Sequence, residues 1–204
     1  MKKTILKLMV AGLVLLTTAA GGFAEEMAGQ GEMSPEQKEM MARMEAYSTV
    51  NENHALLATL AGSWKATIEH KMSADAPAET SEGTSQNVMV FGGRFLEQVY
   101  QGEFGGNPFE GKGIMGYDNI QKRFQGIWYD SMATGIMVSV STYDSAKKVF
   151  SEEGQLSCPL TNGQRSFRGV TTLIDADHYT YEMFMKDESG NEFRAMRIDY
   201  ARVK

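Results

Sequence analysis

Apolar positions recur with two different periods along the chain, and the change of period divides the chain into a helical N-terminal segment and a strand-rich remainder. From Met40 the apolar residues follow helical spacing, after a start signal in which Ser34 can act as N-cap and Gln37 can complete a capping box. A second, shorter helix is predicted to begin at Asn51. The pattern therefore predicts an N-terminal helical segment over residues 34–61.

Strict alternation replaces the helical period at residue 64. Trp64, Ala66, Ile68 and His70 fall on one face, as does Met72, with polar residues between them. Short segments of this kind continue to the C-terminus, separated by turns rich in Gly, Asn and Asp. An antiparallel meander of that length removes its exposed edge strands most simply by closing into a barrel. The sequence thus predicts an all-β fold, an up-and-down barrel of about ten strands over 62–204, with strands near 63–73, 82–91, 94–104, 109–118, 122–130, 134–143, 148–157, 165–174, 178–187 and 192–203.

The first 24 residues have the layout of a secretory signal peptide. Three lysines precede an apolar run from Leu8 to Leu16, and small residues follow as far as Ala24. The apolar run is shorter than the roughly 20 residues of a membrane-spanning helix. We therefore expect cleavage near Ala24, a flexible leader over 25–33, no stable membrane insertion after cleavage, and a periplasmic or secreted protein.

Charge limits the possible binding partners, and cysteine content limits the possible disulfides. The chain has 20 basic and 26 acidic residues, and removal of the three lysines of the signal peptide leaves a net charge of −9. An acidic surface without basic clusters excludes nucleic acid as a partner. The single cysteine, Cys158, cannot form an intrachain disulfide, and we expect it to be a small buried residue. The oligomeric state does not follow from these numbers.

The segment Gly111–Gly116 reads GKGIMG and matches the dinucleotide-binding fingerprint G-x-G-x-x-G. That fingerprint works at the start of a helix, where free N–H groups hold a pyrophosphate. Here it lies inside a predicted strand, so we reject the dinucleotide site. We expect a structural role instead, with Gly113 or Gly116 leaving space for the ring of Trp128 on the next strand.

Several motifs in order resemble a bacterial family, the domain of unknown function family 1579. The resemblance covers nearly all of residues 50–204, and it implies almost nothing about activity because the family has no assigned function. The motifs are H-x2-L-x2-L-x-G-x-W from His54 to Trp64, GRFL from Gly93 to Leu96, PFEGxGx2GYDN from Pro108 to Asn119, W-x-D from Trp128 to Asp130, Thr134-Gly135, and Tyr200-x-Arg202.

A wider similarity is to the calycin barrels: the lipocalins, the fatty-acid-binding proteins and the nitrobindin group. In those barrels a short helix precedes G-x-W at the start of the first strand, and a basic residue of the last strand packs over the Trp. Gly62-Ser63-Trp64 looks like this motif. The resemblance implies that Arg202, or as an alternative Arg197, lies over the Trp64 ring.

The leading functional hypothesis is a non-enzymatic exported barrel that binds a small apolar or amphipathic molecule in its lumen. No catalytic residue, metal ligand or cofactor can be assigned from the motifs. On the last strand either the apolar or the charged set of residues faces inward, which leaves open whether charges reach the lumen. The candidate ligand-binding residues are Trp64, His70, Tyr100, Tyr117, Trp128, Arg197 and Tyr200; the structural ones are Gly62, Trp64, Gly113, Gly116 and Arg202.

Two other classes of function remain open at this point. His70 could ligate haem or a metal, together with His54 and His178, although a buried, hydrogen-bonded His is the plainer interpretation. A Met-rich N-terminal region could hold copper, or could simply supply the apolar stripe of a helix. Asp118, Asp130 and Arg94 could form a hydrolase or isomerase site at strand ends, although Asp beside Asn is typical of turns. The methionines are Met27, Met33, Met40, Met41 and Met44.

Overall fold

The computed structural model describes residues 33–159 and 161–204, which form parts of two compact units, residues 1–45 and 46–204. The predicted signal peptide, the leader up to residue 32 and Met27 lie outside the described residues. Cleavage and export therefore stay predictions.

Helix α3 (Pro35–Ser48) begins as predicted. The Ser34 amide donates to Oε1 of Gln37 at 2.8 Å, and the Gln37 amide donates to Oγ of Ser34 at 3.3 Å, so the capping box is confirmed. Glu39 and Arg43 form the expected i,i+4 ion pair. No residue of α3 is buried.

Helix α4 (Glu52–Ala58) is short and well capped. Asn51 accepts from the Asn53 amide, and its own amide donates to Nδ1 of His54 at 3.1 Å, which closes a second capping box. Leu57 is fully buried, and Leu60 just beyond the helix is also buried, with 8% of its surface exposed. Among the described residues the two helices span only 14 and 7 residues, and neither has the length or apolar character for a membrane crossing.

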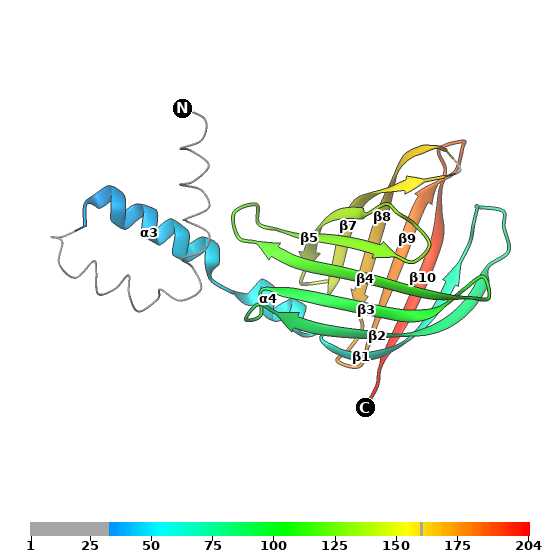
Figure 1. Cartoon of the computed structure of the whole chain (residues 1–204), viewed down its shortest axis with the longest axis horizontal. Helices are drawn as coiled ribbons and strands as arrows, with labels where there is room; N and C mark the ends of the chain where they lie inside the picture. The colour runs from blue at the N-terminus through cyan, green and yellow to red at the C-terminus, as the bar shows by residue number, and fades with distance from the viewer. Residues whose placement is uncertain (1–32, 160) are drawn as a thin grey trace, which may run out of the picture. The chain divides into compact units, whose positions relative to one another are not determined.

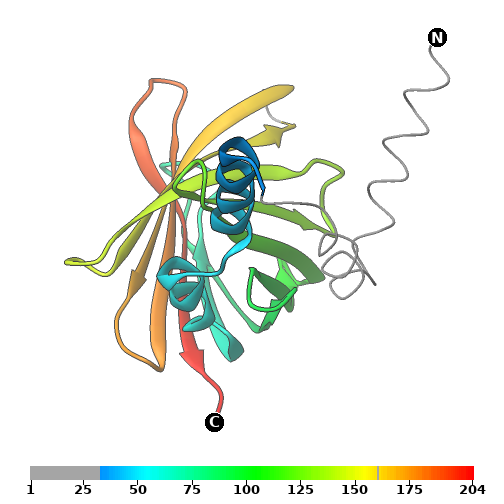
Figure 2. The same ribbon diagram turned by 90° about the vertical axis from the view of Figure 1, so that its left-hand side faces the viewer.

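Ten antiparallel strands follow one another around a closed barrel, as predicted (Figure 1). Each strand pairs with its neighbours in sequence, and β1 pairs with β10 to close the barrel. Helix α4 contacts β2, β3 and β4 at one end of the barrel, which Figure 2 shows from that side. The strands are β1 (Gly62–His70), β2 (Glu79–Val90), β3 (Phe95–Phe104), β4 (Asn107–Asp118), β5 (Arg123–Asp130), β6 (Met137–Asp144), β7 (Val149–Cys158), β8 (Gly163–Leu173), β9 (His178–Lys186) and β10 (Glu192–Arg202).

The alternation on β1 sets the inner face of the barrel. Trp64, Ala66, Ile68 and His70 are buried and the intervening residues are more exposed. Met72 lies beyond the end of β1 and is exposed, so its predicted place on this strand is wrong. The buried core gathers at the α4 end, where a short helix and strand ends meet; its residues there include Leu57, Leu60, Trp64, Leu96, Phe124, Phe150, Tyr179 and Tyr200.

Glycines on β4 make room for large rings on both faces of the sheet. A Cβ on Gly111 would lie 2.7 Å from Cη2 of Trp128, and one on Gly113 would lie 3.1 Å from Cε3 of the same ring. The prediction for Gly113 is therefore confirmed, and Gly111 has the same role. The alternative for Gly116 is wrong, because it faces outward beneath Phe95, whose Cε1 would be 2.6 Å from its Cβ.

Candidate functional site

The α4 end of the barrel is closed by Arg202 and Trp64. The guanidinium of Arg202 lies 4.0 Å from the centroid of the Trp64 ring. Its nitrogens donate to the carbonyl oxygens of Thr59, Ala61 and Ala176 at 2.7 to 2.9 Å. Gly62, with φ of +125°, passes directly under this guanidinium, where a side chain would overlap it. The predicted structural roles of Gly62, Trp64 and Arg202 are those that the geometry assigns.

A polar network lines the interior above this floor. Oγ of Ser85 donates to Oδ1 of Asn87 at 2.7 Å, and Nε2 of Gln98 donates to Oγ of Ser85 at 2.8 Å. Nδ2 of Asn87 donates to the carbonyl of Leu60 at 2.9 Å, which ties the network to the end of α4. These groups satisfy one another in the interior, as buried polar atoms must. Tyr200 completes this layer, because its buried hydroxyl forms a hydrogen bond with the Gln98 side chain. Burial raises the pKa of this hydroxyl.

Aromatic rings pack against one another on the inner face of the wall formed by β1 to β4. His70 stacks on Phe104 with ring centroids 4.3 Å apart, and Tyr100 meets Phe109 edge to face at 5.7 Å. Tyr100 is 3% exposed, and its ring lies over Gly83, a position at which any side chain would overlap it. This wall buries two of the predicted ligand-binding residues, His70 and Tyr100.

The opposite wall carries several inward-facing side chains that are only half-buried. They lie on β5, β6, β7 and β9 among buried residues such as Phe124, Phe150 and Met183, and they keep part of their surface accessible although they point to the barrel axis. Their inward direction follows from alternation in phase with buried residues of the same strand, such as Trp128 with Phe124 and Ser139 with Ser141. Packed cores bury such positions almost completely. The partly accessible set includes Trp128, Ser139, Glu152, Leu156 and Tyr181.

Glu152 is the ionisable group on this wall. Desolvation by burial raises the pKa of its carboxyl, and hydrogen bonds from Ser139 and Tyr181 oppose that shift. Burial and the nearby Glu152 raise the pKa of the Tyr181 phenol well above its ordinary value. Gly169 lies between them on β8, and a Cβ there would overlap Oε2 of Glu152 and lie 3.1 Å from the Tyr181 ring. Three strands therefore bring one carboxyl and two hydroxyls together.

Sequence reasoning missed Glu152. It sits beside Glu153 in a pair that resembles a solvated surface, but it alternates in phase with Phe150 and Leu156, which face inward. This alternation with inward-facing apolar residues was the sequence signal that could have placed Glu152 inside the barrel.

Arg197 does not face the lumen. Ile198 pairs with the buried Ile68 and faces inward, so Arg197 and Asp199 lie on the outer surface, where they bond to each other at 2.7 and 2.9 Å. The apolar set of β10 is thus the inner set, and neither the ligand-binding prediction for Arg197 nor its alternative placement over Trp64 is what the structure shows. Tyr117, partly buried at the α4 end, meets Phe124 edge to face at 4.9 Å.

The predicted strand-end carboxylate site does not assemble. In the β4–β5 ladder Asp118 pairs with Arg123 and Asp130 pairs with Gly111, which puts the two carboxylates at opposite ends of the barrel. Asp118 accepts from the amides of Ile120 and Gln121 as a turn former. The predicted convergence of these groups is wrong, because antiparallel pairing separates residues that each end a strand.

The three histidines also lie apart. His54 caps α4, and His178 bonds to Asp175 at 3.0 Å on the outer surface. Nε2 of His70 is 3.7 Å from the Glu79 carboxylate, and its Nδ1 is buried with no partner among the described residues. A haem ligand must offer one ring nitrogen to open space, which His70 does not do here. Within residues 33–159 and 161–204 no group of three His, Cys, Asp or Glu could hold a metal.

The methionines of α3 are exposed: Met40 by 57%, Met41 by 54% and Met44 by 61%. Met33 is also exposed. Copper binding by this region stays a prediction. Cys158 is buried, as predicted.

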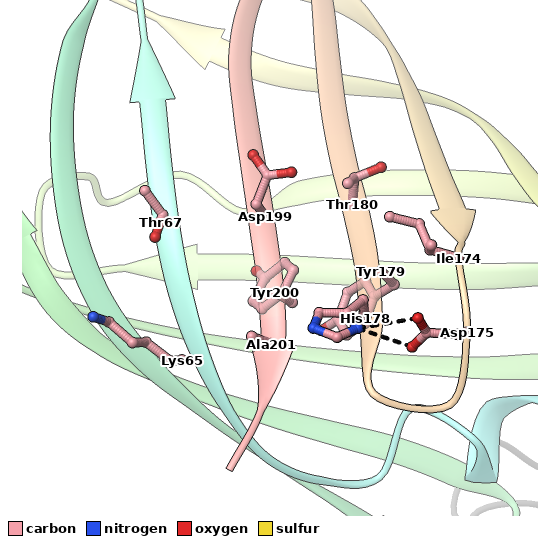
Figure 3. A pocket seen from close by; sticks show the side chains of 10 residues that line it. All are labelled: Lys65, Thr67, Ile174, Asp175, His178, Tyr179, Thr180, Asp199, Tyr200 and Ala201. Carbon is pink, nitrogen blue, oxygen red and sulfur yellow. Dashed lines mark hydrogen bonds and ion pairs between the residues drawn. The ribbon is translucent and has the colours of Figure 1, made fainter.

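A hollow of about 290 Å³ lies on the outer surface, separate from the lumen (Figure 3). Residues of β1, β9 and β10 line it, with the loop that carries Asp175; Lys65 and Asp199 face outward, whereas Tyr179 and Tyr200 belong to the core. Its dyad of His178 and Asp175 also closes the turn before β9, since Asp175 accepts from the amide of Asp177 at 2.8 Å. We assign this dyad to the turn.

Comparison with known proteins supports the fold. The structure resembles the crystal structure of Rv2717c from M. tuberculosis, with a TM-score of 0.58 at 14% identity over 76% of this chain and all of that one. It also resembles the S-type phycobiliprotein lyase CPES from Guillardia theta, with a TM-score of 0.53 at 13% identity over 79% of this chain and 97% of that one. At such identities the likeness shows the fold alone.

A comparison with curated proteins finds no match. A family profile described as "Protein of unknown function (DUF1579)" matches residues 49–202, the whole barrel with α4. The motifs at the α4 end, from His54 to Trp64 and around Arg202, fall within this match. The chain therefore belongs to the DUF1579 family.

Proposed function

We propose that the protein binds a small, mainly apolar molecule inside the barrel, against the wall formed by β5, β6, β7 and β9. One observation carries this proposal: several side chains on that wall, among them Trp128, Glu152 and Leu156, face the barrel axis and yet stay partly accessible, whereas the α4 end is packed shut. Small ligand sites combine an apolar lining with a few placed polar groups. Trp128 and Leu156 supply the apolar surface, and Glu152 with its hydroxyl partners supplies the polar part.

One of the solved structures of similar fold is an S-type phycobiliprotein lyase, and its likeness to this chain is compatible with the proposal. The low identity transfers no ligand to this chain.

Fluorescence of the neutral dye N-phenyl-1-naphthylamine tests the proposal. Leu156→Trp would fill the accessible side of the lumen and should weaken dye binding about tenfold, roughly the loss of one well-buried apolar contact. Gln155→Trp is the matched control, because residue 155 is exposed on the outer face of the same strand. Binding that is equal in both variants would place the dye outside the barrel and contradict the proposal.

We also infer that the protein acts outside the cytoplasm, after cleavage near Ala24. The support is the basic, apolar and small-residue sequence of residues 1–24. Mass spectrometry of protein recovered from the periplasm or the medium should give an N-terminus at Glu25. Recovery of the uncleaved chain from the cytoplasm would contradict this inference.

A further inference from the structure

Glu152 has no basic partner, although it faces the interior of the barrel. Its hydrogen-bond partners are the hydroxyls of Ser139 and Tyr181, and no ion pair joins it to Lys, Arg or His in the described part of the chain. A carboxylate away from water is normally paired, or it takes up a proton. This carboxyl therefore has an unmet requirement for a cation or a strong hydrogen-bond donor.

Two arginines near the ends of the barrel strands bind backbone carbonyls rather than Glu152. Arg202 at the α4 end donates to the carbonyls of Thr59 and Ala61. Arg165, near the start of β8, donates to the carbonyl of Lys186. Neither forms an ion pair with Glu152, so we expect the counter-charge to come with the ligand.

The position of Glu152 is built rather than incidental. Gly169 leaves the space in which Oε2 lies, and Tyr181 packs against the same glycine from the next strand. Each hydroxyl can donate one hydrogen bond to the carboxylate, and an ionised carboxylate has about four acceptor positions. Acceptor positions thus remain for a donor on a bound molecule.

We infer that Glu152, Ser139 and Tyr181 select ligands that carry a basic nitrogen on an apolar skeleton, an inference that rests on the proposed ligand-binding function. The ammonium or N–H group would donate to Glu152 while the skeleton lies against Trp128 and Leu156. A carboxylate ligand, such as a fatty acid, would meet a like charge in a site of low dielectric constant, and that contact is unfavourable.

Competition with N-phenyl-1-naphthylamine at neutral pH tests the selectivity. Octylamine, octanol and octanoate share one apolar chain and differ in the head group. Octylamine should displace the dye at a concentration about tenfold or more below that of octanoate, as a charge-assisted hydrogen bond predicts. Octanol should fall between them.

Variants of two adjacent residues test whether Glu152 causes the preference for octylamine. Glu152→Gln keeps the size of the side chain and removes its charge, so it should remove the preference for octylamine. Glu153→Gln should leave the preference unchanged, because residue 153 is exposed on the outer face of the same strand. The dye itself is neutral and should bind to both variants, which also reports that both are folded.

The outcomes separate the two proposals. If the dye binds but octylamine and octanoate compete equally, or if Glu152→Gln keeps the preference, the inference about the head group is wrong and lumen binding stands. If neither the dye nor any octyl compound binds, the proposed function fails and the selectivity fails with it.

Discussion

The guanidinium of Arg202 covers the indole ring of Trp64 at 4.0 Å, and the two residues are also cross-strand partners in the β1–β10 ladder. The same guanidinium binds the backbone after α4 and the loop before β9. One side chain thus joins the first strand, the last strand and the helix that closes the barrel.

Replacing Arg202 with Met should destabilise the fold by about 2–4 kcal/mol, because three carbonyl oxygens lose a charged donor and the Trp64 ring loses its cation. The measurement is the urea midpoint at constant m-value. Arg197→Met is the control: its ion pair with Asp199 is on the outer face, so the expected change is about 1 kcal/mol or less. Equal losses in the two variants would contradict the role of Arg202.

Gly111→Ala should destabilise the barrel by about 1–3 kcal/mol, because the new methyl group would overlap the Trp128 ring that packs on this glycine. Gly163→Ala provides a comparison at a strand position where the nearest atom would be 3.7 Å away, an ordinary contact. Thermal unfolding of both variants measures the difference. A Gly111→Ala protein as stable as the Gly163→Ala protein would show that Trp128 does not depend on the glycine.

Glu152→Gln should change the dependence of stability on pH. Because the folded-state pKa of Glu152 is raised, the fold favours its protonated form, and the stability linked to that form is complete below the unfolded-state pKa of about 4.3. That stability is lost as the pH rises through the folded-state pKa. The variant should therefore match the wild type in acid and exceed it at neutral pH.

Urea unfolding of both proteins across that pH range checks this prediction. Glu153→Gln should give a curve parallel to that of the wild type, since its side chain is exposed. A stability difference between Glu152→Gln and the wild type that shrinks with rising pH would mean that the carboxyl is stabilised, and not desolvated, by the fold.

Asn119→Ala should loosen the segment that leads into α4. The Asn119 amide donates to the carbonyls of Ala46 and Thr49 at 2.9 and 2.7 Å, and its Oδ1 accepts from Asn51, the N-cap residue, at 2.8 Å. The expected loss is about 1–2 kcal/mol, with faster hydrogen exchange at the amides of α4. In Asn107→Ala, which removes a hydrogen bond only within the β3–β4 turn, exchange in α4 should not change.

Much of the fold could be predicted because strands and turns leave local signals. Alternation and Gly- or Asn-rich turns place all ten strands to within a few residues, and the capping residues Ser34 and Asn51 start both helices. The resemblance to calycin barrels also identifies Gly62, Trp64 and Arg202, because it connects positions that are distant in sequence.

The residues that line the lumen could not be predicted in the same way, because the direction of a side chain, inward or outward, depends on the register between strands. Arg197 and Ile198 alternate on β10, and only the pairing of Ile198 with Ile68 decides which of them is inside. Glu152 and Tyr181 meet across an intervening strand at a glycine, a contact with no trace in either local sequence. Gly113 and Gly116 differ by three positions and so lie on opposite faces.

The pairing of β1 with β10 also has a kinetic consequence. Trp64 meets Arg202, so the barrel joins residues from nearly opposite ends of its sequence, and this contact raises the contact order of the fold. Until the last strand is available, β1 presents an unpaired edge that could pair with another chain. Closure should therefore be the late, slow step of folding, and it is the step at which incomplete chains would aggregate.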